Sequence, residues 1–112
     1  MAIHLRQICL VASDLTKSVE NLSEILSIPP CFWDPSVGEF GLKNTLLRVG
    51  TDFIEIVSPE QENTAAERFL KRRGGDGGYM VITQVKTKAE QDIYRARAAD
   101  NGVRVAWERE AV

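Results

Sequence analysis

Glu55 is the residue whose type and surroundings most strongly suggest chemistry. It stands in the run Phe53-Ile54-Glu55-Ile56-Val57, a single carboxylate among large apolar side chains. If this run is a strand, Phe53, Glu55 and Val57 share one face. An acid in such surroundings needs a partner, a metal ion or a proton, so Glu55 is the candidate catalytic base. The alternative is that this face is open to solvent, and Glu55 is then only the polar side of a half-buried strand.

Histidine and cysteine offer little further chemistry. His4 is the sole histidine, lies near the start of the chain and falls on the strand face opposite Gln7, so we expect an exposed terminal residue rather than a catalytic one. Cys9 and Cys31 are separated by 22 positions without a second close pair, which does not suit a zinc site. We expect both cysteines to be small buried hydrophobic residues.

A glycine-rich stretch at residues 74–78 follows the basic run Lys71-Arg72-Arg73. A phosphate-binding loop follows a strand and opens a helix, whereas these glycines follow a helix and lead into a strand. The order therefore predicts a helix C-cap and a turn. The alternative left open is that the arginines contact an anionic group of a ligand.

The composition describes one ordinary globular domain of 112 residues, with 44% hydrophobic and 27% charged residues. A net charge of −2 argues against a general nucleic-acid-binding protein. The longest apolar run near the N-terminus, residues 8–12, is too short for a membrane span. With only two cysteines, we expect a reducing compartment, the cytoplasm.

Periodicity and turn residues predict an α+β order of elements. Strands are expected at residues 7–12, 31–33, 43–49, 52–57, 79–85 and 103–107, helices after Ser13-Asp14, after Thr64 and over residues 88–100, and a loop at 34–38. Placing Met80 on Gln7, a shift of 73 residues, repeats this order of elements without repeating the letters. The expected single domain, residues 1–112, thus holds a βαβββ module at 1–59, a linker helix and glycine turn at 60–78, and an incomplete second βαβ module at 79–112.

Three segments carry a resemblance to a known family: residues 7–15 (QICLVASDL), residues 53–59 (FIEIVSP), and residues 68–75 with 78–82 (RFLKRRGG and GYMVI). They resemble the vicinal oxygen chelate superfamily of glyoxalase I, methylmalonyl-CoA epimerase, extradiol dioxygenases and bleomycin-resistance proteins. The resemblance is nearest to the epimerase- and glyoxalase-like branch and covers nearly the whole chain. It implies a cupped mixed sheet with helices on its convex face.

The resemblance also implies a divalent metal ion held by four side chains on the concave face. Gln7 stands where the family has a histidine, Glu55 matches the carboxylate or amide ligand, and Met80 replaces a second histidine. The fourth position lies beyond residue 112. Because a thioether is a poor ligand for hard divalent ions, we expect no metal and no other cofactor, with a divalent ion as the alternative.

We therefore expect a protein that binds a small organic molecule, of the bleomycin-resistance type with a degenerate metal site. The alternative is a metal-dependent isomerase or lyase of the epimerase or glyoxalase type that uses Glu55, and a closed regulatory or structural domain is a third possibility. The expected lining of the cavity is Gln7, Cys9, Phe53, Glu55, Met80 and Ile82. Missing strands would expose a sheet edge, so we expect either a homodimer or a chain that lacks its C-terminal portion.

Overall fold

The computed structural model describes residues 3–30, 38, 41–106 and 108–109. The chain divides into two compact units. The larger unit, Leu5–Ile82, contains the sheet and two helices, and the smaller unit combines Met1–His4 with Thr83–Val112. The expected strand at residues 31–33, Cys31 and most of the expected loop at 34–38 lie outside the described residues.

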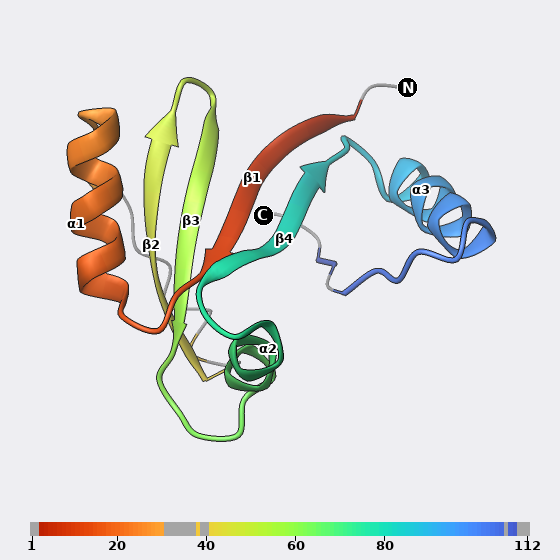
Figure 1. Cartoon of the computed structure of the whole chain (residues 1–112). Helices are drawn as coiled ribbons and strands as arrows, with labels where there is room; N and C mark the ends of the chain where they lie inside the picture. The colour runs from red at the N-terminus through yellow and green to blue at the C-terminus, as the bar shows by residue number, and fades with distance from the viewer. Residues whose placement is uncertain (1–2, 31–37, 39–40, 107, 110–112) are drawn as a thin grey trace. The chain divides into compact units, whose positions relative to one another are not determined.

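The sheet has four strands in the order β2-β3-β1-β4 (Figure 1). In chain order the elements are β1 (His4–Val11), α1 (Leu15–Leu26), β2 (Leu42–Val49), β3 (Asp52–Pro59), α2 (Ala65–Arg73) and β4 (Gly77–Gln84). β1 runs parallel to β3, whereas β2 and β3 form an antiparallel hairpin. The structure is therefore α+β with an open mixed sheet, as predicted.

Both helices of the larger unit begin where the sequence predicts, and α2 also ends where it predicts. Asp14 caps α1 by accepting a hydrogen bond from the Lys17 N–H at 3.1 Å, and the Oγ1 atom of Thr64 caps α2 in the same way. Side-chain oxygens at these positions satisfy amides that a first helical turn leaves unpaired. Gly74 ends α2 with φ at 84°, a left-handed conformation that glycine adopts without steric cost.

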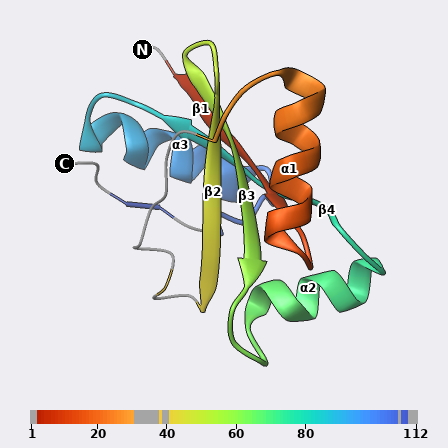
Figure 2. The same ribbon diagram turned by 90° about the vertical axis from the view of Figure 1, so that its left-hand side faces the viewer.

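The two faces of the sheet are covered by different helices. α1 packs over β2 and β3, where Val19 joins a buried cluster with Ala12, Leu47 and Ile56 (Figure 2). α2 packs on the opposite face, where Ala66 joins Cys9, Val11, Leu42 and Val57. The expectation that all helices cover the face opposite Glu55 therefore holds for α1 but is wrong for α2. The apolar positions of α2 at residues 66, 69 and 70 form one stripe, and this stripe packs on the apolar end of the Glu55 face.

The smaller unit contains α3 (Lys88–Asp100), which has the predicted bounds. The predicted strand at residues 103–107 is wrong for its described residues, because residues 103–106 form no strand. Alternating valines at 103 and 105 gave the strand signal, but the Val103 N–H instead donates to the Ala98 carbonyl oxygen at 2.8 Å. This bond continues the end of α3, so local helix capping prevails over the alternation pattern.

None of the helices among the described residues is both long enough and apolar enough to cross a membrane.

Candidate functional site

Strand register places Glu55 in the middle of the sheet. Its Cα pairs with that of Cys9 on β1 and with that of Leu46 on β2. Gln7 pairs with Phe53, one step along the same face. Neighbouring strands in register bring side chains of equal parity onto one face, so Gln7, Cys9, Phe53 and Glu55 lie together, as predicted.

The carboxylate of Glu55 is held between two amide side chains. Gln7 donates from Nε2 to Oε1 of Glu55 at 2.7 Å, and Asn44 donates from Nδ2 to Oε2 at 2.7 Å. Glu55 is only 6% exposed and Asn44 only 1%. The alternative in which Glu55 is the solvent-exposed side of a strand is therefore wrong.

This arrangement explains how an acid is tolerated inside the sheet. A buried carboxylate without partners is strongly destabilising, whereas short hydrogen bonds to both oxygens offset much of that cost. The amides come from β1 and β2, the two strands beside β3, so the backbone fixes the direction of the carboxylate. A carboxylate can accept about four hydrogen bonds, so beside the two amides and the Cys9 thiol, which also hydrogen-bonds to Glu55, it can accept a further one.

Cys9 contributes a thiol beside this carboxylate. It is buried, as expected, and Sγ lies 3.9 Å from the carbonyl oxygen of Leu10. Burial is the main cause that raises the pKa of the Cys9 thiol far above its usual range, and the nearby negative charge of Glu55 raises it further. The thiol therefore stays protonated in the folded protein and is a poor nucleophile.

The raised pKa of Cys9 predicts a loss of stability in alkali. The unfolded chain releases the thiol proton above about pH 9, while the folded chain retains it, so the free energy of unfolding falls as pH rises beyond that point. The stabilisation is fully present below the unfolded pKa. Urea denaturation at pH 7 to 10.5 should show this decline, and Cys9→Ala should reduce its slope. An equal slope in the variant would contradict the assignment to Cys9.

The other predicted lining residues are less closely gathered. Phe53 and Met80 are half-buried, and Met80 packs against the cluster around Cys9 on the Glu55 face. Ile82 is half-buried, and no described contact fixes it to this site. His4 is exposed, as expected. The structure thus brings together Gln7, Cys9, Glu55 and Met80 on one side of the sheet.

Asn44 is the site residue that sequence reasoning missed. A signal was present, because Asn44 has an apolar residue two positions before it, Leu42, and another two positions after it, Leu46. One polar residue in a buried row indicates a buried partner. The pattern could not name that partner, since only the register of β2 on β3 brings Asn44 to Glu55.

The side chains present do not fit the divalent metal site that the family resemblance implies. Glu55 is the sole carboxylate of this set, and the amides of Gln7 and Asn44 direct their NH2 groups, not their oxygens, at it. Met80 offers only a soft thioether. Among the residues described by the structure, no three His, Cys, Asp or Glu side chains gather in a way that could hold a metal ion.

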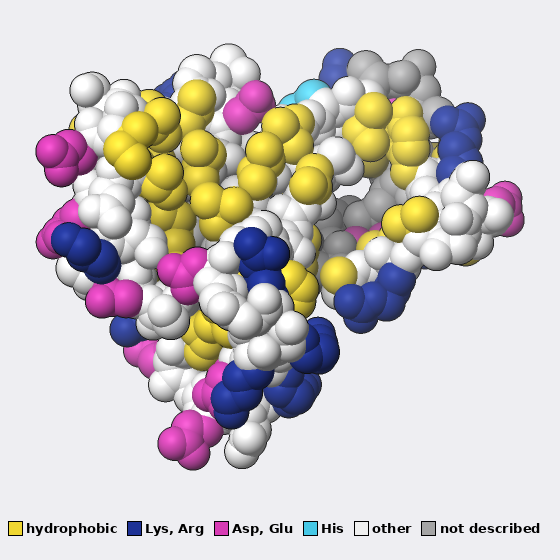
Figure 3. Space-filling model, viewed as in Figure 1, with side chains coloured by type: hydrophobic (Ala, Val, Ile, Leu, Met, Phe, Trp, Pro, Cys, Tyr) yellow, Lys and Arg dark blue, Asp and Glu magenta, His cyan; other side chains and the backbone are white. Residues whose placement is uncertain are grey.

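The basic end of α2 is a further charged feature of the larger unit, and Figure 3 shows Lys and Arg side chains gathered over this helix. Lys71 pairs with Glu67 at 3.1 Å, whereas Arg68 and Arg73 donate to the backbone carbonyl oxygens of Asn63 and Asp76. The glycines that follow end the helix and lead into β4, which confirms the predicted cap. Lys71 and Arg73 lie in the last turn of α2, where positive charges interact favourably with the helix dipole.

Comparison with known proteins gives a likeness at the level of fold. No family model and no curated protein matches the sequence. Among solved structures, methylmalonyl-CoA epimerase from Mycobacterium tuberculosis superposes with a TM-score of 0.74 at 22% identity, over 96% of this chain and 71% of that one. A methylmalonyl-CoA epimerase in complex with methylmalonyl-CoA and NH4+ gives 0.77 at 19% identity, over 99% and 80%.

A Streptomyces coelicolor methylmalonyl-CoA epimerase in complex with 2-nitronate-propionyl-CoA gives a TM-score of 0.75 at 19% identity, over 96% of this chain and 76% of that one. Identities this low establish a shared fold and leave activity open. The chain therefore has the fold of these methylmalonyl-CoA epimerases.

Proposed function

We propose that the Glu55 face binds a small organic molecule without the help of a metal ion. The observation that carries the proposal is the buried Glu55 carboxylate, fixed between the amides of Gln7 and Asn44. Its remaining acceptor position takes a hydrogen bond from a ligand, and Cys9, Phe53, Met80 and Ile82 supply apolar contact.

The charge of Glu55 defines the kind of ligand. No Lys or Arg is hydrogen-bonded to Glu55 among the described contacts, so the ligand group that meets the carboxylate is neutral or a hydrogen-bond donor. A second carboxylate there would be repelled, and repulsion in a poorly hydrated site is strong. The epimerases of similar fold are described with acyl-CoA compounds. An acyl-CoA thioester with an uncharged acyl part, whose pantetheine amide N–H groups can donate to Glu55, is therefore the class of ligand that we propose first.

The proposal predicts a definite order of affinities. Propionyl-CoA should bind more tightly than methylmalonyl-CoA, by about tenfold or more, because only the latter carries a carboxylate in its acyl part. Isothermal titration calorimetry with both compounds, each in the presence of EDTA, measures the difference. Glu55→Gln should reduce the preference to near unity, while Glu24→Gln, a matched change on α1, should leave it intact. Equal affinities in the wild-type protein, or no binding of either compound, would contradict the proposal.

The second candidate is a metal-dependent isomerase with Glu55 as base or ligand, and the epimerase-like fold favours it. It requires proton exchange at the carbon next to a thioester carbonyl. Incubation of propionyl-CoA and methylmalonyl-CoA in D2O with added Co²⁺ distinguishes the two functions by NMR. Exchange that depends on both Co²⁺ and Glu55 would show that the protein is a metal-dependent isomerase and would contradict the proposal of metal-free binding.

The homodimer and the cytoplasmic location that the sequence leads us to expect also remain predictions.

A further inference from the structure

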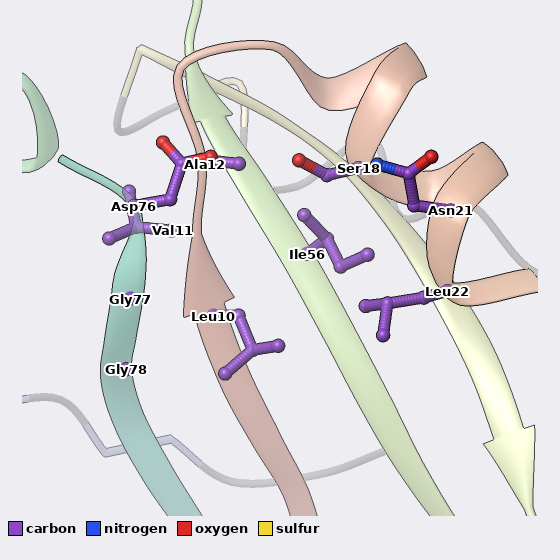
Figure 4. Close-up of a pocket in the computed structure, with 10 residues that line it drawn as sticks. All are labelled: Leu10, Val11, Ala12, Ser18, Asn21, Leu22, Ile56, Asp76, Gly77 and Gly78. Atoms are coloured by element: carbon purple, nitrogen blue, oxygen red, sulfur yellow. The ribbon is translucent and has the colours of Figure 1, made fainter. Parts of the chain in front are cut away.

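A hollow lies on the face of the sheet opposite Glu55. It has a volume of about 330 Å³ and opens between α1 and the start of β4, with β1 and β3 as its floor (Figure 4). Side chains of Leu10, Leu22 and Ile56 point into it. The residues that line it are Leu10, Val11, Ala12, Ser18, Asn21, Leu22, Ile56, Asp76, Gly77 and Gly78. All belong to the larger unit, so the groove is complete within residues 5–82.

Gly78 leaves room for this groove. A Cβ atom on Gly77 would collide with the side chain of Arg73, which belongs to α2 on the Glu55 face. Gly78 itself lines the groove. A Cβ atom on Gly78 would meet nothing within 4 Å. The groove thus has space where other strand residues would place a side chain.

The polar groups of the groove are acidic or neutral. Asp76 lies at the β4 end, and its Oδ1 accepts hydrogen bonds from the N–H and Oγ of Ser13 at 2.9 and 3.2 Å. Asp76 lines the groove, and none of the described hydrogen bonds involves its Oδ2 atom. Arg73 contacts only the backbone oxygen of Asp76 among the described bonds, on the α2 side. Ser18 and Asn21 add neutral hydrogen-bonding groups on the α1 wall.

We propose that this groove is a second binding site, for a small primary amine with an apolar body. The aliphatic side chains of Leu10, Leu22 and Ile56 would cover a ring or branched chain, and the ammonium group would reach the carboxylate of Asp76. The volume is sufficient, since a cavity of about 150 Å³ holds benzene. This site is separate from the Glu55 face. It prefers positively charged ligands over neutral and negatively charged ones.

Benzylamine is a suitable probe, with benzyl alcohol and benzoate as its neutral and anionic counterparts. In ¹H–¹⁵N NMR titrations of the full chain, benzylamine should cause saturable shifts of the Ala12, Gly77 and Gly78 amides. Benzyl alcohol should bind about tenfold more weakly and benzoate should cause no saturable shift. Shifts that do not saturate, or an equal response to benzoate, would overturn the proposal.

Two variants locate the site. Gly78→Leu should fill the groove and weaken benzylamine binding at least about tenfold, whereas Val81→Leu, a change at a 67% exposed position of the same strand, should not. Asp76→Asn retains an oxygen for Ser13 and removes the charge, so it should weaken benzylamine but not benzyl alcohol. Glu55→Gln should leave benzylamine binding unchanged. Wild-type affinity in both Gly78→Leu and Asp76→Asn would overturn the proposal.

Discussion

Leu47→Ala is expected to lower the free energy of unfolding by about 2–5 kcal/mol, because it opens a cavity in the tightest part of the core. Leu47 is 0% exposed and packs in one cluster with Ala12, Val19 and Ile56 between α1 and the sheet. Small domains have a total stability of about 5–15 kcal/mol, so this single change removes a large share of it. Urea denaturation followed by circular dichroism measures the loss.

Val49→Ala is the matched control for Leu47→Ala, since Val49 lies at the end of the same strand and is 40% exposed. Its expected cost is below about 1 kcal/mol. Equal losses in the two variants would show that α1 does not pack over β2 and β3 as described.

Asn44→Leu is expected to destabilise the protein by about 2–3 kcal/mol, although the two side chains have similar size. The change removes the donor to Oε2 of Glu55 and leaves a buried carboxylate oxygen without that partner. The penalty comes from the unsatisfied charge rather than from lost packing. Urea denaturation at pH 7 gives its size.

A double-mutant cycle separates this electrostatic cost from packing. Glu55→Met in the Asn44→Leu background removes the carboxylate as well, so the double variant should recover much of the stability lost by Asn44→Leu alone. Gln7→Leu should behave in the same direction but more weakly, because Gln7 is only half-buried. Strictly additive effects of Asn44→Leu and Glu55→Met would mean that the two side chains do not interact.

Local signals in the sequence predict most of the secondary structure. Asp14, Thr64 and Thr87 each cap the helix that follows them, and Gly74 ends α2. Capping and left-handed turns depend on a few neighbouring residues, so they can be read without knowledge of the fold. The prediction of a strand at residues 103–106 was wrong, because a strand needs a partner strand and a local pattern of residues cannot show whether one is present.

The sequence predicted only some of the residues of the candidate site. Alternation in two strands put Gln7, Cys9 and Glu55 on one face, and the structure confirms this. Asn44 was missed because the position of β2 relative to β3 is a matter of register, and a shift of one residue would turn Asn44 to the opposite face. The sequence also left open whether the face of Glu55 is exposed to solvent, because its strand pattern suits an exposed and a buried face equally. The structure shows that Glu55 is buried.

The sequence by itself therefore determined the order of the elements β1 to α3 that the structure describes, the starts of the helices and the presence of an acid in an apolar strand. These follow from interactions between residues close in the chain. Only the tertiary structure decided that α2 packs on the Glu55 face, that Gln7 and Asn44 donate hydrogen bonds to the two carboxylate oxygens of Glu55, and that a groove opens beside Gly78. Each of these depends on contacts between distant segments, whose geometry is set by the packing of side chains rather than by local preference.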